Sequence, residues 1–362
     1  MDYTAEVGTK LERVRALMAE HQLGAVWLRR SASVAWITGG IDVAVNTADV
    51  LGVASVVVTP DNATMWTNTI EAPRLQAEDG VEGRGIELRV SPWEQPQPVE
   101  LGATLGTDFP LEGAKDLTRE IAIQRSRLLP VEVERFRQLG GACAEAIHRA
   151  INRVKPGNTD HEIAAALSYE TRAVSTNPIV VLVGVDDRVH AVRHPLPVGQ
   201  VMDKYAMLVL CGRRDGLVCS VTRLVHFGKL SDDLRHRMDA TADVDAAMIA
   251  ASRPGTSLEE MFKITQDAYA QAGFADEWKL HHQGGLAGYN PRELLAVPGE
   301  GVQLEGDMVC AWNPSITGTK SEDTILVTND GPEVLTPLYG WPMRAVEVGG
   351  MTIERPLILA IE

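Results

Sequence analysis

The feature that most constrains the fold is a segment that occurs twice in the second half of the chain. Lys155-Pro156-Gly157-Asn158-Thr159-Asp160-His161-Glu162 resembles Arg253-Pro254-Gly255-Thr256-Ser257-Leu258-Glu259-Glu260. Each copy places a hydroxyl residue three positions before a glutamate, which is the pattern of a helix capping box. An amphipathic helical pattern precedes each copy, over 131–153 and 231–252, and a second helical pattern follows it.

Apolar runs typical of β-strands follow each helix pair. They are Ile179–Val183 and Met207–Leu210 after the first copy, and Met308–Trp312 and Thr324–Val327 after the second. The pattern predicts a duplicated helix–helix–sheet unit, and an α/β (α+β) fold class. Coincidence is the competing explanation, because a Pro-Gly turn is a common helix start.

The N-terminal part predicts a smaller α/β domain. Residues 9–22 have the apolar spacing of a helix, and short β-rich runs follow at Ala25–Leu28, Val34–Thr38, Val50–Val58 and Thr64–Thr67. Periodicity fades between about 90 and 130, where prolines and glycines indicate a linker. A chain of 362 residues has the length of two domains. We expect them at 1–128 and 129–362.

Composition excludes several classes of partner. The chain carries 34 Lys and Arg residues against 49 Asp and Glu residues, a net charge of −15, so we expect no nucleic-acid partner. Apolar stretches such as Tyr205–Cys211 are far shorter than the ~20 residues of a membrane helix, and the N-terminus lacks the apolar core of a signal peptide. The four cysteines form no CxxC motif and predict buried thiols in a reducing compartment. We therefore expect a cytoplasmic protein that acts on a small molecule and has no membrane partner.

Candidate site residues lie in the C-terminal half. HExxH, GxxxxGK[ST] and GxSxG motifs do not occur. Polar or rigid segments occur at Arg193–Pro197, Cys219–Arg223, His281–Gly285, Ala311–Ser315 and Lys320–Asp323. Each has a structural explanation: His194 could bond a backbone carbonyl, Trp312 could fill the core, and Glu322 could be solvated. The histidine pair beside two glycines is the best single indication of a site, because glycines let a ligand approach the backbone and histidine titrates near neutral pH.

Four of these stretches carry a resemblance to a known family. GLVCSVTR (216–223), HHQGGL (281–286), MVCAWNPS (308–315) and SEDTILVT (321–328) resemble the pita-bread fold of the methionine aminopeptidase, aminopeptidase P, prolidase and creatinase superfamily. The N-terminal part is similar to the creatinase/prolidase N-terminal domain. The resemblance covers nearly the whole chain and agrees with the duplication, since the pita-bread fold has two related halves. It implies a homodimer.

The resemblance also implies that most metal ligands are missing. The family's metallopeptidases hold two metal ions with two Asp, one His and two Glu. In this sequence the first Asp falls at Val209, or at Leu210 with a one-residue gap, whereas the other four positions carry Ser220, His282, Asn313 and Glu322. Two divalent cations need several carboxylates, so we expect no metal cofactor. The family's second active-site histidine and the Glu after it are replaced by Tyr289 and Asn290.

Creatinase, which hydrolyses a C–N bond without metal, offers another comparison within the superfamily. By resemblance, His194 corresponds to its catalytic histidine and Glu322 to one of two substrate-gripping glutamates. The other glutamate position carries Thr222, beside Arg223. We do not expect creatine as substrate, because a guanidinium would lose half of its carboxylate clamp.

We therefore predict a metal-independent hydrolase or lyase that acts on a C–N bond of a small polar molecule with a carboxylate. His194 is expected as base or proton shuttle, His282 as the group that polarises a substrate oxygen, and Glu322 as an orienting carboxylate. The predicted substrate-binding residues are Arg193, Ser220, Thr222, Arg223, Tyr289, Asn290, Trp312 and Asn313. Two alternatives stay open: a Xaa-Pro aminopeptidase or dipeptidase with an atypical metal site, and a non-catalytic pita-bread binding module.

Overall fold

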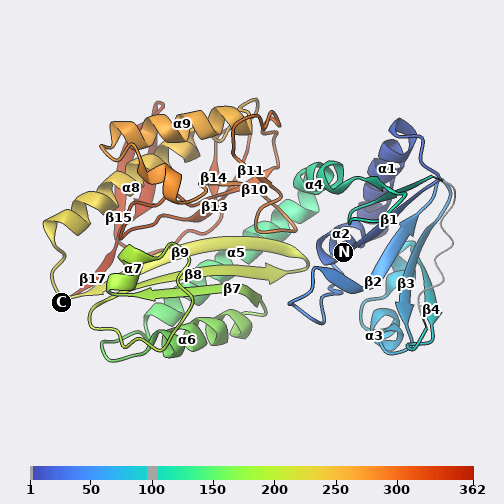
Figure 1. Ribbon diagram of the computed structural model, residues 1–362, viewed down its shortest axis with the longest axis horizontal. Helices are drawn as coiled ribbons and strands as arrows, with labels where there is room; N and C mark the ends of the chain where they lie inside the picture. Colours follow the sequence, from blue (N-terminus) through green and yellow to red (C-terminus); the bar gives the residue numbers. More distant parts are fainter. Residues whose placement is uncertain (1–2, 96–103) are drawn as a thin grey trace. The chain divides into compact units, whose positions relative to one another are not determined.

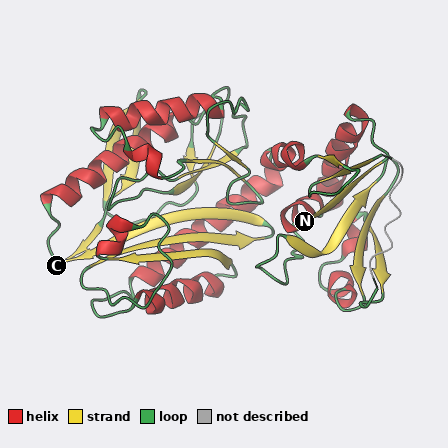
Figure 2. Ribbon diagram, viewed as in Figure 1, coloured by secondary structure: helices red, strands yellow, loops and turns green. Residues whose placement is uncertain are grey.

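The computed structural model describes residues 3–95 and 104–362 and has a mixed α/β architecture (Figures 1 and 2). Its contacts divide the chain into two compact units. The first comprises Met1–Val131 with Asp215–Leu217, and the second comprises Glu132–Arg214 with Val218–Glu362. The domain boundary predicted after residue 128 falls close to this break. No helix in the described ranges combines the length and apolar character needed to cross a membrane.

The first unit is built on a six-stranded sheet with the strand order β4-β3-β2-β1-β5-β6. Its strands are β1 (Ala25–Arg30), β2 (Leu51–Val58), β3 (Ala63–Asn68), β4 (Glu87–Ser91), β5 (Leu105–Thr107) and β6 (Lys115–Asp116). Its helices are α1 (Tyr3–Glu20), α2 (Ser31–Ile37), α3 (Ala72–Ala77), the 3-10 helix η1 (Val81–Arg84) and α4 (Thr118–Ser126).

Two predictions for this unit are wrong. Val34–Thr38, predicted as a strand, belongs mostly to helix α2, in which Val34, Trp36 and Ile37 are fully buried. Burial of these side chains overrides their preference for strands. The predicted linker contains β5, β6 and α4, which are too short to show a clear periodicity in the sequence. Its residues 96–103 lie outside the described part of the chain.

The second unit contains two sheets. The first has the order β17-β9-β8-β7 and the second the order β11-β10-β12-β13-β14. Their strands are β7 (Asn177–Val185), β8 (Tyr205–Arg214), β9 (Leu217–Phe227), β17 (Leu359–Ile361), β10 (Gly284–Ala287), β11 (Leu294–Leu295), β12 (Val309–Trp312), β13 (Asp323–Leu326) and β14 (Glu333–Val334). A hairpin of β15 (Met343–Val348) and β16 (Met351–Pro356) completes the strands. A bridge between Thr222 and Glu322 connects the two sheets.

Helix pairs cover these sheets. Figure 1 shows α5 (Pro130–Ile151) and α6 (Asp160–Ala173) beside the first sheet, and α8 (Asp232–Ala251) and α9 (Leu258–Gln271) beside the second. Two short helices, α7 (Asp187–Ala191) and η2 (Glu277–Leu280), lie in the connections before β8 and β10. The second helix pair packs on a core that includes Met248, Leu286, Met308, Trp312 and Ile325.

Backbone hydrogen bonds confirm the predicted duplication. Gly157 N donates to Met202 O at 2.9 Å, and Gly255 N donates to Leu304 O at 2.8 Å. Both glycines adopt a positive φ, 92° and 96°, which side chains rarely tolerate. The repeated Pro-Gly motif therefore makes the same turn twice and fastens each helix pair to the strand region that follows.

The helix caps repeat less completely. Thr159 and Glu162 form a full capping box at the start of α6. At the start of α9, Glu260 N donates to Ser257 Oγ at 3.1 Å, which is the first half of the same box. The two copies therefore share the N-cap hydroxyl but differ in how the glutamate is used.

Candidate active site

A pocket of about 390 Å³ lies within the second unit and brings together titratable side chains from several of the predicted segments. It is lined by Val180, Leu182, His194, Leu196, Val209, Cys211, His282, Pro291, Arg292, Asn313, Lys320 and Glu322. A concave site with convergent polar groups is the usual place for chemistry in an α/β protein.

One wall of the pocket is apolar. Val180 and Leu182 are two residues apart on β7, so they share one face of the sheet. Their register partners on β8 are Cys211 and Val209. Val209, one of the two positions predicted to correspond to the family's first aspartate, lines this wall, so the wall offers no carboxylate.

The opposite side of the pocket is charged and centres on Glu322, which is 2% exposed. Lys320 Nζ lies 3.1 Å from Glu322 Oε2, and Arg292 Nη2 donates to Glu322 Oε1 at 3.0 Å. The Thr222 hydroxyl also donates to Glu322 Oε2, at 2.6 Å. Burial opposes ionisation of this carboxyl, but the two cations and the hydroxyl outweigh burial and lower the pKa of Glu322 to about 2. Glu322 is therefore a carboxylate at neutral pH.

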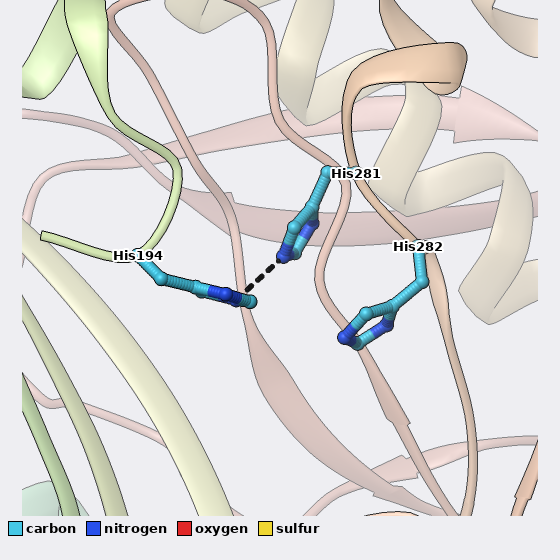
Figure 3. A group of neighbouring side chains, drawn as sticks. All are labelled: His194, His281 and His282. Atoms are coloured by element: carbon cyan, nitrogen blue, oxygen red, sulfur yellow. Dashed lines mark hydrogen bonds between the residues drawn. The ribbon is translucent and has the colours of Figure 1, made fainter.

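Three histidines gather at the pocket (Figure 3). His194 lies on the connection between α7 and β8, and His281 and His282 directly precede β10. His281 Nε2 is 2.9 Å from His194 Nε2, and the rings of His281 and His282 stack with centroids 4.6 Å apart. His194 and His282 are exposed at the rim, whereas His281 is half-buried.

The surroundings keep these histidines neutral. Burial and the neighbouring charge of Lys320 lower the pKa of His194. Burial, with Arg292 and Lys320, lowers the pKa of His282 to about 4, and burial with Lys320 lowers the pKa of His281 to about 2. A neutral imidazole can accept a proton at pH 7.

Asn313 supplies a polar group with no partner among the described residues. It follows β12, is 2% exposed, and lines the pocket, and its Oδ1 atom accepts no hydrogen bond. An unpaired buried polar atom is costly, so the pocket is built to receive a donor at this point.

Two predicted residues stand behind the lining. Thr222 donates to Glu322 as described, and Ser220 Oγ accepts a 3.3 Å hydrogen bond from Arg292 Nη1. Both are buried on β9. They contact the charged side chains and are not among the residues that line the pocket.

Five other predicted binding residues are not among those that line this pocket, and each has a structural partner. Arg193 pairs with Glu277 and donates to Thr317, Arg223 pairs with Asp323, Tyr289 donates to Glu132, Asn290 donates to Glu293, and Trp312 donates to Ser252. Their polar atoms are used for packing the fold. Their predicted role in substrate binding has no support from this pocket and stays a prediction.

Three neighbours of the predicted site residues are not identified by the sequence analysis. Lys320 stands two residues before Glu322 in a segment that was singled out, and this spacing could have indicated that both side chains face one way. His281 was noted only as one of a pair. Arg292 follows Pro291 in a loop with no periodic signal, so nothing in the sequence connects it to a glutamate thirty residues later.

Comparisons with known proteins agree with this architecture. A family model described as metallopeptidase family M24 matches residues 134–329, more than half of the chain. A model of the creatinase/prolidase N-terminal domain matches residues 10–152. The pita-bread fold with its N-terminal domain, expected from the resemblance, is thereby confirmed.

Individual relatives are distant in sequence but alike in fold. An uncharacterized peptidase of Staphylococcus haemolyticus is 26% identical over 243 residues, which cover 64% of this chain and 68% of the relative. A Xaa-Pro dipeptidase of Lactobacillus helveticus is 26% identical over 227 residues, which cover 59% of this chain and about three fifths (61%) of the relative. The prolidase of Pyrococcus horikoshii OT3 superposes with a TM-score of 0.78 at 17% identity, over 91% of this chain and 98% of that one.

These findings support a hydrolase that acts on a C–N bond, because the family and the named relatives are peptidases. With its central residues matched by the family model and its fold shared with a solved prolidase, the chain belongs to metallopeptidase family M24.

Proposed function

We propose that this protein hydrolyses the C–N bond of a small amide or dipeptide that carries a carboxylate, and that it does so without the dinuclear metal centre of its family. One observation carries the proposal: Arg292 contacts one carboxylate oxygen of the buried Glu322, and Lys320 contacts the other. Two cations and one carboxylate leave the lining with one excess positive charge when the histidines are neutral.

The donor set does not fit two divalent ions. By family resemblance, the five ligand positions carry one imidazole, one carboxylate, an amide, a hydroxyl and an aliphatic side chain. The one carboxylate, Glu322, is already neutralised by two side-chain cations. A metal ion there would have to displace Lys320 and Arg292 and would be repelled by both, without a second carboxylate to compensate.

The same charge excess favours an anionic substrate. A substrate carboxylate would meet Lys320 and Arg292, whose Nε atom has no acceptor among the described residues. An N–H of the substrate would meet Asn313 Oδ1, and an apolar side group would lie on the wall formed by Leu182 and Val209. A volume of about 390 Å³ suits a small molecule of this kind.

The proposed chemistry uses the two rim histidines. His194 takes a proton from a water molecule, and the hydroxide oxygen bonds to the carbonyl carbon. His282 in its neutral form donates an N–H hydrogen bond to the carbonyl oxygen, where negative charge develops. The C–N bond then breaks, and His194 returns the proton to the leaving nitrogen. Glu322 keeps Lys320 and Arg292 in place to bind the carboxylate.

A second candidate is a Xaa-Pro dipeptidase with an atypical metal site. The similarity to a Xaa-Pro dipeptidase and to a prolidase favours this reading, and it favours a dipeptidase over a creatinase-like reaction on a guanidino compound. Dipeptides, including prolyl dipeptides, are therefore the first substrates to test under both readings.

A single assay separates the two candidates. Purified protein, with and without prior dialysis against a chelator, is incubated with dipeptides and N-acyl amino acids in the presence and absence of Mn²⁺ or Co²⁺. We expect cleavage at a rate that dialysis against the chelator does not lower and that added Mn²⁺ does not raise. Cleavage that appears only with added Mn²⁺ or Co²⁺ would overturn the metal-independent reading in favour of the metallodipeptidase.

The carboxylate requirement has its own control. Blocking the substrate carboxylate as an amide is expected to lower kcat/KM at least about tenfold, since a charge-assisted pair contributes roughly 1.5–3 kcal/mol. Arg292→Met should remove this preference, whereas Arg149→Met, on the exposed face of α5, should keep it.

A further inference from the structure

The three histidines at the pocket form a cluster that the proposed reaction uses only in part. In that reaction His194 transfers the proton and His282 donates a hydrogen bond to the carbonyl oxygen, whereas His281 has no role. Each offers a ring nitrogen, and the three atoms lie within 4.8 Å of one another. Figure 3 shows the rings turned toward a shared space, His194 from one connection and the other two from the segment before β10.

This spacing is close to that of a metal site. In a tetrahedral zinc site with Zn–N bonds of about 2.0–2.1 Å, two ligand nitrogens are about 3.3 Å apart. The His194 and His281 nitrogens, at 2.9 Å, need to separate slightly, and the ring of His282 needs to approach. Both changes are side-chain rotations, and His194 and His282 have room for them because they are exposed at the rim.

A second observation supports a ligand at this place. His281 Nδ1 is buried and has no hydrogen-bond partner among the described residues, so this ring depends on its other nitrogen for a polar contact. That contact is His194 Nε2 at 2.9 Å, where two imidazole nitrogens face each other and only one can donate. A cation between them would accept both lone pairs at once.

We propose that His194, His281 and His282 bind one borderline divalent ion, with Zn²⁺ as the preferred species, and that this ion inhibits the hydrolase. Binding of the ion goes beyond the proposed function, whereas inhibition rests on it, because the ion would occupy His194, the proposed base, and His282, the proposed hydrogen-bond donor to the carbonyl oxygen. Three imidazoles without a carboxylate suit Zn²⁺, Ni²⁺ or Cu²⁺ and not the oxygen-seeking Mn²⁺ and Mg²⁺. The site shares only His282 with the ligand positions expected for the dinuclear centre of the family, and it differs from that centre in the number of ions and in their effect.

The nearby charges set the strength of the site. Lys320 and Arg292 line the same pocket as His194 and His282 and repel a dication, while Glu322 offsets one of their two charges. We therefore expect weaker binding than at a structural zinc site, in a range where the ion exchanges with solution.

The binding test needs no substrate. Full-length protein stripped with a chelator is titrated with Zn²⁺ and, separately, with Mn²⁺, and binding is measured by calorimetry and by competition with a chromophoric chelator. We expect one Zn²⁺ per chain, no measurable Mn²⁺, and at least tenfold weaker Zn²⁺ binding in His281→Ala and in His281→Asn. His161→Ala, which removes an exposed histidine at the start of α6, is the matched control and should bind as the unaltered chain does.

The outcomes separate the site from the proposed function. Absence of Zn²⁺ binding, or unchanged affinity in both folded His281 variants, overturns the site and leaves the proposed hydrolysis untouched. If turnover is found, Zn²⁺ should inhibit it reversibly, and His281→Asn should need at least ten times more Zn²⁺ for half inhibition of its own rate. Zn²⁺ binding that raises turnover would support the site, overturn its inhibitory role, and contradict the metal-independent function.

Discussion

The two halves of the second unit have the same backbone plan but contribute different chemistry to the pocket. The turns at Gly157 and Gly255 make equivalent hydrogen bonds, and each half presents a helix pair and a sheet. The first half gives an apolar wall from β7 and β8 and one histidine on a connection. The second half gives His282, Asn313 and the charged group around Glu322.

This difference shows what a duplicated fold determines. The repeated hydrogen bonds fix where side chains project into the pocket, whereas the residue type at each position decides what the pocket binds. Val209 on β8 is one such position: with valine there, the wall from the first half offers a cation no carboxylate.

The largest effect is expected where the second half concentrates its charge. Glu322→Gln should abolish turnover and lower stability by roughly 3–5 kcal/mol, because it leaves Lys320 and Arg292 without their buried counterion. Activity assays and denaturant unfolding measure the two effects. Glu333→Gln, which removes an exposed pair with Arg137, should cost less than about 1 kcal/mol. Equal losses of stability in both variants would mean that Glu322 with Lys320 and Arg292 contributes no more than an exposed ion pair.

The next largest effect is expected at His194, the histidine that the first half contributes to the pocket. His194→Ala should lower kcat by about 10²–10⁴-fold, the range for loss of a general base, with little change in thermal midpoint since the side chain is exposed. The rate is compared with that of His161→Ala. A folded His194→Ala protein with full activity would remove this residue from the mechanism.

An aspartate can be introduced into the apolar wall at Val209, one of the two positions at which the family's first aspartate is expected. Val209→Asp should destabilise the protein by on the order of 3 kcal/mol, because it buries a carboxylate in an apolar wall. Val209→Thr, similar in shape without charge, should cost less. Thermal melts with and without Mn²⁺ test the site: recovery of stability in Val209→Asp by Mn²⁺ would contradict the view that the second half repels metal ions.

The smallest effects concern the helix caps, where the two halves share the N-cap hydroxyl but differ in the use of the glutamate. Thr159→Ala and Ser257→Ala should each lower stability by about 1 kcal/mol, and the first should cost more because it also removes the bond that the Thr159 hydroxyl donates to Glu162 Oε2 at 3.2 Å. Paired urea unfolding curves measure the difference. Equal costs would show that the bond from the Thr159 hydroxyl to the Glu162 carboxylate contributes nothing.

The same cap gives a pH dependence. Bonds from the backbone and hydroxyl of Thr159 lower the pKa of Glu162. A carboxyl whose folded pKa lies below its unfolded value of about 4.5 adds stability above that value, and this contribution is lost as pH falls through the folded pKa. The stability of Thr159→Ala should therefore fall less between pH 5 and 3 than that of the unaltered chain.

Sequence alone predicted the parts of the fold that carry strong local signals. The turns at Gly157 and Gly255 and the long strands of the second unit are visible in composition and periodicity. Ion pairs could not be predicted in this way, because an arginine can reach carboxylates that are distant in sequence. Arg193 and Arg223 were expected to bind substrate and instead pair with Glu277 and Asp323, whereas the unremarked Arg292 reaches the pocket.

The charged group around Glu322 also has an evolutionary consequence. On the proposed reading, a lineage that carries Glu322 together with Lys320 and Arg292 cannot return to metal binding one residue at a time. Each reverse step, taken singly, leaves either a cation without its counterion or a carboxylate without its metal, and both intermediates are less stable than the start. Descendants of such a lineage are therefore expected to keep the lysine, the arginine and the glutamate together or to lose them together.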